Sequence, residues 1–159
     1  MSLDELITEI RSYIDEPDIE LVKEAYRYAK EAHQGQDRVS GEPFVSHPLN
    51  VARLMAEFKL DVTSITAALL HDTVEDTEAT LEEIREKFGA EIEVLVNGVT
   101  KLNKMDFESK EEHQAESLRK MFLAMAKDIR VVLIKLVDRL HNMRTLNYLR
   151  EEKRKRKAT

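Results

Sequence analysis

The sequence predicts an all-α fold, and two observations carry that prediction. The 159 residues include only 4 Gly and 3 Pro, so few positions interrupt regular structure. Several segments repeat apolar residues at three- and four-residue spacing, whereas no segment alternates apolar and polar residues long enough to predict a strand. With 42% hydrophobic residues, the chain is long enough for one domain with a sizeable core and too short for two.

The expected elements follow in order along the first hundred residues. Residues 1–17 are expected to form an N-terminal helix or lead-in, and Asp18 caps the next helix, which runs to about Ala32. The stretch from His33 to Pro48 holds two glycines and two prolines and must be irregular, with room for a short β-hairpin. Four helices are then expected, at residues 48–58, 62–71, 81–88 with Gly89 as the stop, and 92–101.

The last third of the chain is predicted to be a loop followed by a long helix. Residues 103–113 lack apolar periodicity and should form a loop, for which a lid is a plausible role. The helix is expected over about 115–148 with a break near Asp128. Residues 131–137 read V-V-L-I-K-L-V, which suits a central position. The basic residues 151–159 are expected to form a solvated helix end, and 18–150 the folded domain.

Composition excludes several classes of protein. The sequence has no cysteine, which removes disulfides and thiolate metal sites and fits the reducing cytoplasm. No apolar run approaches the roughly 20 residues of a membrane span, and the first residues are acidic where a signal peptide is basic. A formal charge of −6 argues against general nucleic-acid binding. An anionic ligand must therefore be held locally.

Residues 70–77, L-H-D-T-V-E-D-T, combine a histidine with three carboxylates directly after a segment that looks buried. On a helix, His71 and Glu75 would share one face, as would Asp72 and Asp76. Burial of so many acceptors requires a positive charge among them. A metal ion would supply that charge. The alternative for Glu75 and Asp76 is a solvated helix end in which Asp76 or Thr77 caps the next element.

Two further residues could complete a metal site. His47 precedes Pro48 at the end of the irregular stretch, and Asp138 lies within the most apolar helix. A buried, charged Asp138 needs a cation, which could be a metal, Arg139 or Arg53. Two imidazoles with two carboxylates suit Mn, Fe or Zn better than Ca or Mg. Each residue alone is more often structural, but their order, H then H-D then D, is uncommon by chance.

That pattern resembles the HD superfamily of metal-dependent phosphohydrolases. The longer motifs are similar to the N-terminal hydrolase domain of the RelA/SpoT alarmone enzymes, over roughly residues 18–150. They are H-Q-G-Q-D-R-V-S-G-E-P-F at 33–44, S-H-P at 46–48, A-A-L-L-H-D-T-V-E-D-T at 67–77, G-V-T-K-L at 98–102 and D-I-R-V-V-L-I-K-L-V-D-R-L-H-N-M-R-T-L at 128–146. The resemblance implies an HD-type helical bundle.

The resemblance also implies an activity and roles for residues. The reaction would be the Mn2+-dependent removal of the 3′-pyrophosphate from guanosine tetra- or pentaphosphate, (p)ppGpp, to give GDP or GTP. Carried over by position, the metal ligands would be His47, His71, Asp72 and Asp138. Glu75 and Asp76 would position or deprotonate the attacking water. The substrate would contact Arg38 and Ser40 at the base, and Asn142, Arg144 and Thr145 at the ribose and phosphates.

Alternatives remain open at this point. The protein could be an HD phosphohydrolase of a deoxynucleotide or a cyclic nucleotide, or a module that binds the alarmone without turnover. Arg38 and Arg144 could be ordinary surface arginines. In the long relatives a covalently linked synthetase domain follows the hydrolase region. The chain could be the excised hydrolase piece of such an enzyme, which we favour, or a stand-alone small alarmone hydrolase.

Overall fold

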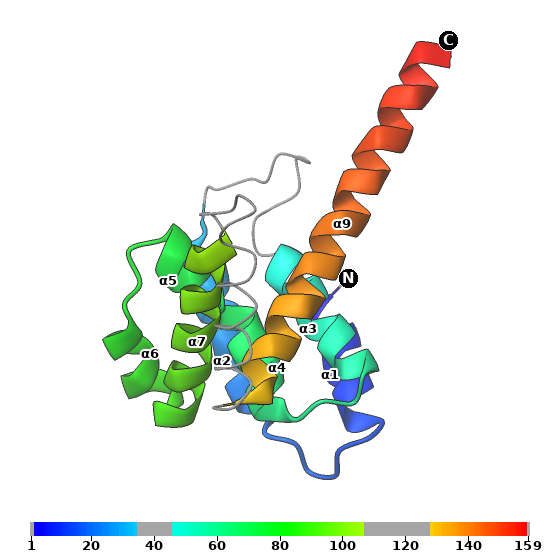
Figure 1. Cartoon of the computed structure of the whole chain (residues 1–159). Helices are drawn as coiled ribbons and strands as arrows, with labels where there is room; N and C mark the ends of the chain where they lie inside the picture. Colours follow the sequence, from blue (N-terminus) through cyan, green and yellow to red (C-terminus); the bar gives the residue numbers. More distant parts are fainter. Residues whose placement is uncertain (1, 35–45, 107–127, 159) are drawn as a thin grey trace.

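The computed structural model describes residues 2–34, 46–106 and 128–158, and every element within these ranges is an α-helix (Figure 1). The prediction of an all-α fold is therefore confirmed. The predicted β-hairpin and the loop after residue 106 lie outside the described residues. The helices are α1 (Leu3–Arg11), α2 (Ile19–Ala32), α3 (Ser46–Glu57), α4 (Val62–Leu70), α5 (Thr73–Asp76), α6 (Leu81–Phe88), α7 (Ala90–Asp106) and α9 (Ile129–Ala158).

Helix α4 lies at the centre of the bundle. Its sequence, V-T-S-I-T-A-A-L-L, is apolar or small almost all round, and every residue from Ser64 to Leu70 is buried. It packs against α2, α3, α7 and α9. A helix without a polar face can be accommodated only where neighbours cover all its sides. Because α4 is central, the residue that follows Leu70 lies in the protein interior.

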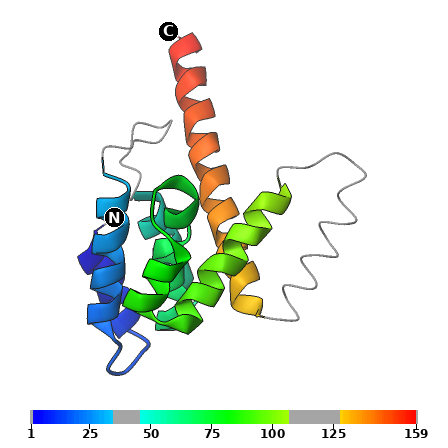
Figure 2. The same cartoon turned by 90° about the vertical axis from the view of Figure 1, so that its left-hand side faces the viewer.

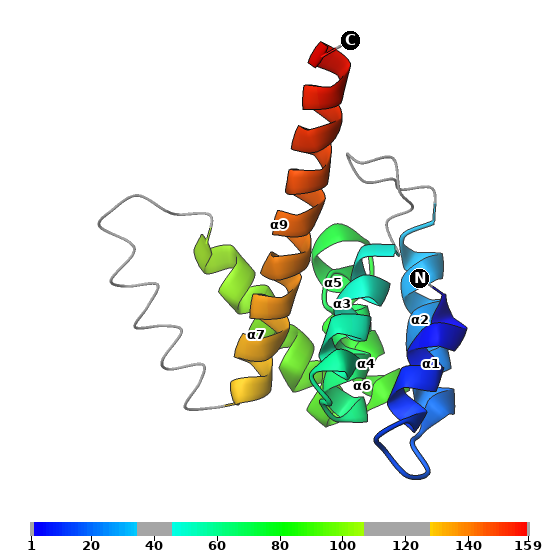
Figure 3. The same ribbon diagram turned by 90° about the vertical axis from the view of Figure 1, so that its right-hand side faces the viewer.

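Helix α9 closes the bundle with its N-terminal part and extends beyond it with its C-terminal part. The N-terminal part packs against α3, α4 and α7 and buries Val131, Ile134 and Val137. Figures 2 and 3 show the C-terminal part projecting away from the other helices. No described helix combines the length and the apolar composition that a membrane span requires.

Local signals set several of the helix ends. The Asp18 side chain accepts a hydrogen bond from the Leu21 backbone N–H at 3.2 Å, which confirms the predicted cap of α2. Thr80 caps α6 in the same way, through the Glu83 N–H at 3.2 Å. Helix α6 ends at Gly89, as predicted, and the φ angle of Gly89 is +99°, a conformation that side chains with a Cβ rarely adopt.

Other boundaries differ from the sequence prediction. Helix α3 begins at Ser46, so His47 lies in its first turn rather than in the preceding irregular stretch. Helix α7 runs to Asp106, which makes residues 103–106 helical and corrects the predicted start of the loop at 103. On α7 the core extends past the predicted helix end at residue 101, because Leu102 is still buried. Helix α4 ends at Leu70, one residue before the predicted end. Helix α9 continues past Tyr148 to Ala158, which agrees with the helix end expected for residues 151–159.

The N-terminus of α9 is fixed by an arginine network. The Arg130 guanidinium donates to Asp128 Oδ2 at 2.6 Å and to Glu91 Oε1, on α7, at 2.7 Å. The Asp128 carboxylate also accepts from the Arg130 backbone N–H at 2.9 Å, which caps the helix. These bonds set the start of α9 relative to α7 and hence the position of residues further along α9.

Gly98 allows α7 and α9 to pack closely. A Cβ at Gly98 would lie 2.7 Å from Cγ2 of Val131 and 3.1 Å from its Cγ1. Glycine normally weakens a helix interior by about 1 kcal/mol relative to alanine. Its presence in α7 is explained by this contact, because Val131 is buried and β-branched and has little freedom to rotate away.

We predict that Gly98→Ala destabilises the protein by about 1–3 kcal/mol, because overpacking exceeds the gain in helix propensity. The measurement is the free energy of unfolding in urea, with Val94→Ala on the exposed face of α7 as the control, expected within about 0.5 kcal/mol of the parent. Val131→Ala should relieve the clash, so the double variant should be more stable than the sum of the two single changes predicts. An additive result would contradict the close-contact explanation.

Candidate metal centre

The His71–Asp72 pair lies at the junction between α4 and α5. His71 follows the last residue of α4 and is fully buried. Its Nδ1 lies 2.5 Å from the carbonyl oxygen of Ala68, one turn earlier, so Nδ1–H is the donor and Nε2 points into the site. This tautomer is assigned from the hydrogen bond. Asp72 begins the short helix α5, and its side chain is 13% exposed.

His47 and Asp138 reach the same place from two other helices. His47 is in the first turn of α3 and is 3% exposed, while Asp138 is on α9 and is 6% exposed. The Asp138 Oδ1 contacts His47 Nε2 and lies 3.1 Å from His71 Nε2. Asp72 Oδ1 lies 3.1 Å from His71 Nε2, and Asp72 Oδ2 lies 3.7 Å from His47 Nε2.

One ligand atom from each of these four residues lies within 4.8 Å of every other. Donor atoms bound to one transition ion at about 2.1 Å can be at most about 4.2 Å apart. The widest separation therefore exceeds that limit by up to about 0.6 Å, which side-chain rotations can supply. Two imidazole nitrogens with two carboxylate oxygens form a donor set that suits a divalent transition ion.

The proton arrangement at this centre also favours a cation. A neutral His71 that donates from Nδ1 presents a lone pair at Nε2, and that lone pair faces carboxylate oxygens of Asp72 and Asp138. Acceptors in contact need a proton or a metal ion between them. Burial would lower the pKa of His71, but the two carboxylates outweigh it and raise that pKa. Burial would raise the pKa of Asp138, but bonds to His47 and His71 lower it instead. Without metal, the centre therefore holds protons.

The arginine partners considered for Asp138 are not found. Among the described side chains, no salt bridge joins Asp138 to Arg53 or Arg139. Arg139 is exposed, and Arg53 pairs with Glu57 on its own helix at 3.6 Å. The Asp138 carboxylate instead contacts His47 and His71, which could also bind a metal ion together with it.

Glu75 and Asp76 follow the His71–Asp72 pair on α5 and are not among the four clustered ligands. The chain leaves α4 at Leu70 and re-enters a helix at Thr73, so residues 71–76 do not form the continuous helix that the sequence spacing assumed. Both carboxylates are exposed, unlike His71 and Asp72. Burial and the neighbouring carboxylate of Asp72 raise the pKa of Asp76, so its charge is close enough to interact with the centre.

The predicted substrate contacts are only partly described. Arg38 and Ser40 lie outside the described residues. Asn142 is half-buried on α9, four residues after Asp138 and therefore on the same side of the helix. Arg144 and Thr145 continue α9, and only their backbone is described. Their contacts with a substrate stay predictions.

The sequence prediction missed His141. Its Nδ1 lies 2.6 Å from Nδ1 of His47, on the side of the ring opposite Asp138. A signal was present, because His141 follows Asp138 by three residues and must share its helix face.

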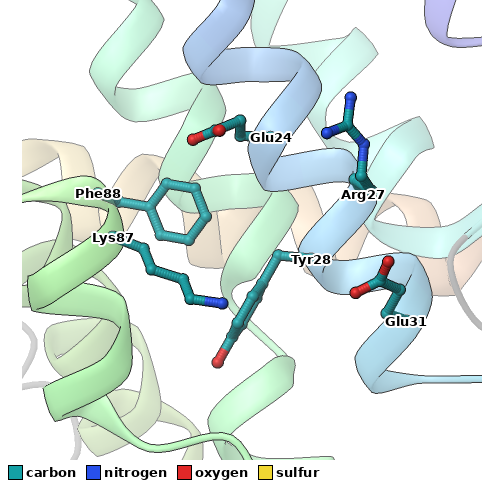
Figure 4. Close-up of a pocket in the computed structure, with 6 residues that line it drawn as sticks. All are labelled: Glu24, Arg27, Tyr28, Glu31, Lys87 and Phe88. Atoms are coloured by element: carbon teal, nitrogen blue, oxygen red, sulfur yellow. The ribbon is translucent and has the colours of Figure 1, made fainter.

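Two hollows adjoin this region on the α2–α6 side. One of about 280 Å³ is lined by Glu24, Arg27, Tyr28, Glu31, Lys87 and Phe88 (Figure 4), and Lys87 Nζ lies 4.8 Å from the centre of the Tyr28 ring. The other, about 670 Å³, includes Asp76, Glu78 and Glu83. Tyr28 donates a hydrogen bond to Glu83 at 2.7 Å. Carboxylates and cations are equal in number around the first hollow, whereas carboxylates outnumber Lys87 around the second, which makes the second unsuited to phosphate.

Comparison with known proteins gives the centre a context. A family model described as "HD domain" matches residues 25–159. The chain is 55% identical over 152 residues to a "GTP pyrophosphokinase" of Myxococcus xanthus, and 52% identical over 149 residues to the "Bifunctional (p)ppGpp synthase/hydrolase SpoT" of Escherichia coli K12. Each alignment covers 94% of this chain but only 20% or 21% of the relative. The chain thus spans about a fifth of the length of these relatives.

A solved structure gives a similar result. The structure of a metazoan ortholog of SpoT, described as hydrolysing ppGpp, matches with a TM-score of 0.62 and 32% identity. The match covers 80% of this chain and 71% of that chain.

We predict that metal affinity at this centre falls as the pH falls. The raised pKa of His71 means that its proton remains bound above the ordinary imidazole value of about 6.5, and an incoming ion must displace it. For each proton that the ion must displace, the apparent affinity falls by about tenfold with each unit decrease in pH. Calorimetric titration of Mn2+ between pH 6 and 8, in buffers of different ionisation enthalpy, measures both affinity and proton release. A pH-independent affinity without proton release would contradict the assignment.

We predict that the contribution of His71 to the stability of the metal-free protein falls as the pH rises, whereas the metal affinity increases. A raised His71 pKa contributes stability that is complete below about pH 6.5 and is lost as the pH rises through the folded-state pKa. A lowered Asp138 pKa contributes stability above about pH 4 that is lost on acidification through the folded-state pKa. The rise in melting temperature caused by Mn2+, measured against EDTA-treated protein, should therefore increase with pH.

Proposed function

The chain belongs to the HD domain family, and on that basis we propose that it is a metal-dependent (p)ppGpp 3′-pyrophosphohydrolase. The observation that carries the proposal is the convergence of His47, His71, Asp72 and Asp138 within 4.8 Å, with the carboxylate of Asp76 close enough to interact with Asp72. The substrate class is supported by relatives named for (p)ppGpp and by a structural neighbour described as hydrolysing ppGpp.

The buried and the exposed residues would have different roles in the reaction. The four buried side chains would hold the ion, for which we propose Mn2+, and the bound ion would polarise the phosphoryl group and lower the pKa of the attacking water. Glu75 and Asp76, which are exposed on α5, would orient that water and accept its proton. The raised pKa of Asp76 makes its carboxylate a better proton acceptor than an ordinary aspartate.

The substrate would be held on the α9 side. Asn142, Arg144 and Thr145 follow Asp138 on α9, and Arg38 and Ser40 are proposed to hold the guanine base. The opposite side, near α2 and α6, has an excess of carboxylates that would repel the pyrophosphate. Asn142 is the described member of this set, one helical turn after Asp138.

The length of the relatives suggests which part of a larger enzyme the chain represents. The Escherichia coli relative is named for both synthesis and hydrolysis, and the chain corresponds to about a fifth of it. We assign the chain to the hydrolase part, because a buried metal centre with adjacent carboxylates suits water attack at phosphorus. A linked synthetase domain and a cytoplasmic location complete the proposal.

The proposal is tested by offering ppGpp, pppGpp, deoxynucleoside triphosphates and cyclic nucleotides to the purified protein with Mn2+. Anion-exchange chromatography resolves the products, and the expected result is pyrophosphate with GDP or GTP. EDTA should abolish turnover, and Mn2+ should restore it. Turnover of deoxynucleotides without ppGpp hydrolysis would identify another HD phosphohydrolase. Binding of ppGpp without pyrophosphate release would identify a non-catalytic module.

Two substitutions should separate turnover from metal binding. Glu75→Gln removes a proton acceptor and should lower kcat by about 10²- to 10⁴-fold while Mn2+ affinity stays within a few-fold of the parent. Asp138→Asn removes a ligand and should lower activity and Mn2+ affinity together, the affinity by at least about tenfold. Single-turnover kinetics and calorimetry provide the two measurements. The exposed Glu78→Gln, three residues after Glu75, is the control.

Near-normal turnover by Glu75→Gln would assign activation of the attacking water to Asp76 or to the ion alone. Unchanged Mn2+ affinity in Asp138→Asn would contradict the proposed ligand set.

A further inference from the structure

His47 is contacted at both ring nitrogens by helix α9. Asp138 lies at Nε2, and His141, three residues further along α9, lies at Nδ1. The two Nδ1 atoms are 2.6 Å apart, the ring centroids are 4.8 Å apart, and the rings are tilted by 32°. The His47 imidazole is therefore fixed in position and in rotation by a helix other than its own.

This contact also fixes the tautomer of His47. Two facing ring nitrogens form a hydrogen bond only if one carries a proton and the other a lone pair. If His47 is to bind an ion through Nε2, that atom must be free of hydrogen, so the proton belongs on Nδ1 of His47. His141 Nδ1 must then be the acceptor, with its own proton on Nε2. The reverse arrangement would place a proton on the nitrogen that faces Asp138.

We propose that His141 is a positioning residue that prepares His47 for metal binding by accepting its Nδ1–H. The inference rests on the proposed function only in taking His47 as a metal ligand. His71 has a corresponding partner within its own helix, the carbonyl oxygen of Ala68, whereas the partner of His47 is a side chain on another helix. A hydrogen bond from the second nitrogen of a ligating histidine typically changes metal affinity by about 10–100-fold.

The test compares two substitutions of nearly equal shape. In His141→Asn, the amide oxygen can occupy the position of the histidine Nδ1 and accept the same hydrogen bond. In His141→Leu, a methyl group occupies that position and cannot. Mn2+ affinity, measured by calorimetry without substrate, should fall by about 10–100-fold in His141→Leu and stay within about threefold in His141→Asn. Equal affinities in both variants, whether both retained or both lost, would overturn the proposal.

A spectroscopic measurement on the unaltered protein keeps the proposal testable if His141→Leu does not fold. Nitrogen-15 chemical shifts of the imidazoles, in the protein loaded with diamagnetic Zn2+, report which nitrogen carries the proton. The expected result is a proton on Nδ1 of His47 and a lone pair on Nδ1 of His141. A proton on Nδ1 of His141 would overturn the proposal. Circular dichroism and the melting temperature in EDTA establish whether each variant is folded.

These measurements are independent of the substrate. Loss of Mn2+ affinity in His141→Leu with rescue in His141→Asn would support the positioning role even if ppGpp proved not to be the substrate. Conversely, hydrolysis of ppGpp by the unaltered protein, together with unchanged Mn2+ affinity in His141→Leu, would leave the proposed function intact and remove the role of His141.

Discussion

The structure depends on one electrostatic constraint: two carboxylates and two imidazoles meet in a buried space, and most of the atoms that face one another there are acceptors. Their ligand atoms lie within 4.8 Å of one another, and three of the four residues are less than 10% exposed. Such a cluster is stable only with positive charge inside it, whether as protons on the histidines or as a divalent ion. Because the protons reside on the ligand atoms themselves, metal binding, protonation and folding stability are coupled at this centre.

Helix packing holds the four ligand side chains in a defined geometry. The ligands come from α3, α9 and the α4–α5 junction, so the centre forms only when these elements are held in register. Gly98 lets α9 approach α7 closely, and Arg130 fixes the start of α9 through Asp128 and Glu91. Two turns or so beyond Arg130, Asp138 then faces the centre and His141 faces the ring of His47. Gly98 and Arg130, which do not belong to the centre, thus help to position the side chains that form it.

The sequence predicted the elements that local signals determine and misplaced others that lack such a signal. The Asp18 cap of α2 and the Gly89 stop of α6 are both backbone effects within a few residues, and both were predicted. The end of α4 at Leu70 and the extension of α7 to Asp106 have no glycine stop to mark them, and spacing alone misplaced both. For the same reason the convergence of His47 and Asp138 could be expected from a resemblance, while the contact of His141 with His47, 94 residues away, was missed.

Burial separates the carboxylates of this region into two chemical classes. Asp138 is almost fully buried, and the bonds from His47 and His71 lower its pKa, so it stays ionised and suits the role of a ligand. Asp76 lies at the exposed rim, where partial burial and the charge of Asp72 raise its pKa and suit it to proton exchange. The same residue type therefore gains different chemistry from different surroundings. The sequence shows only that both are aspartates, and the packing of α9 against the α4–α5 junction gives each its environment.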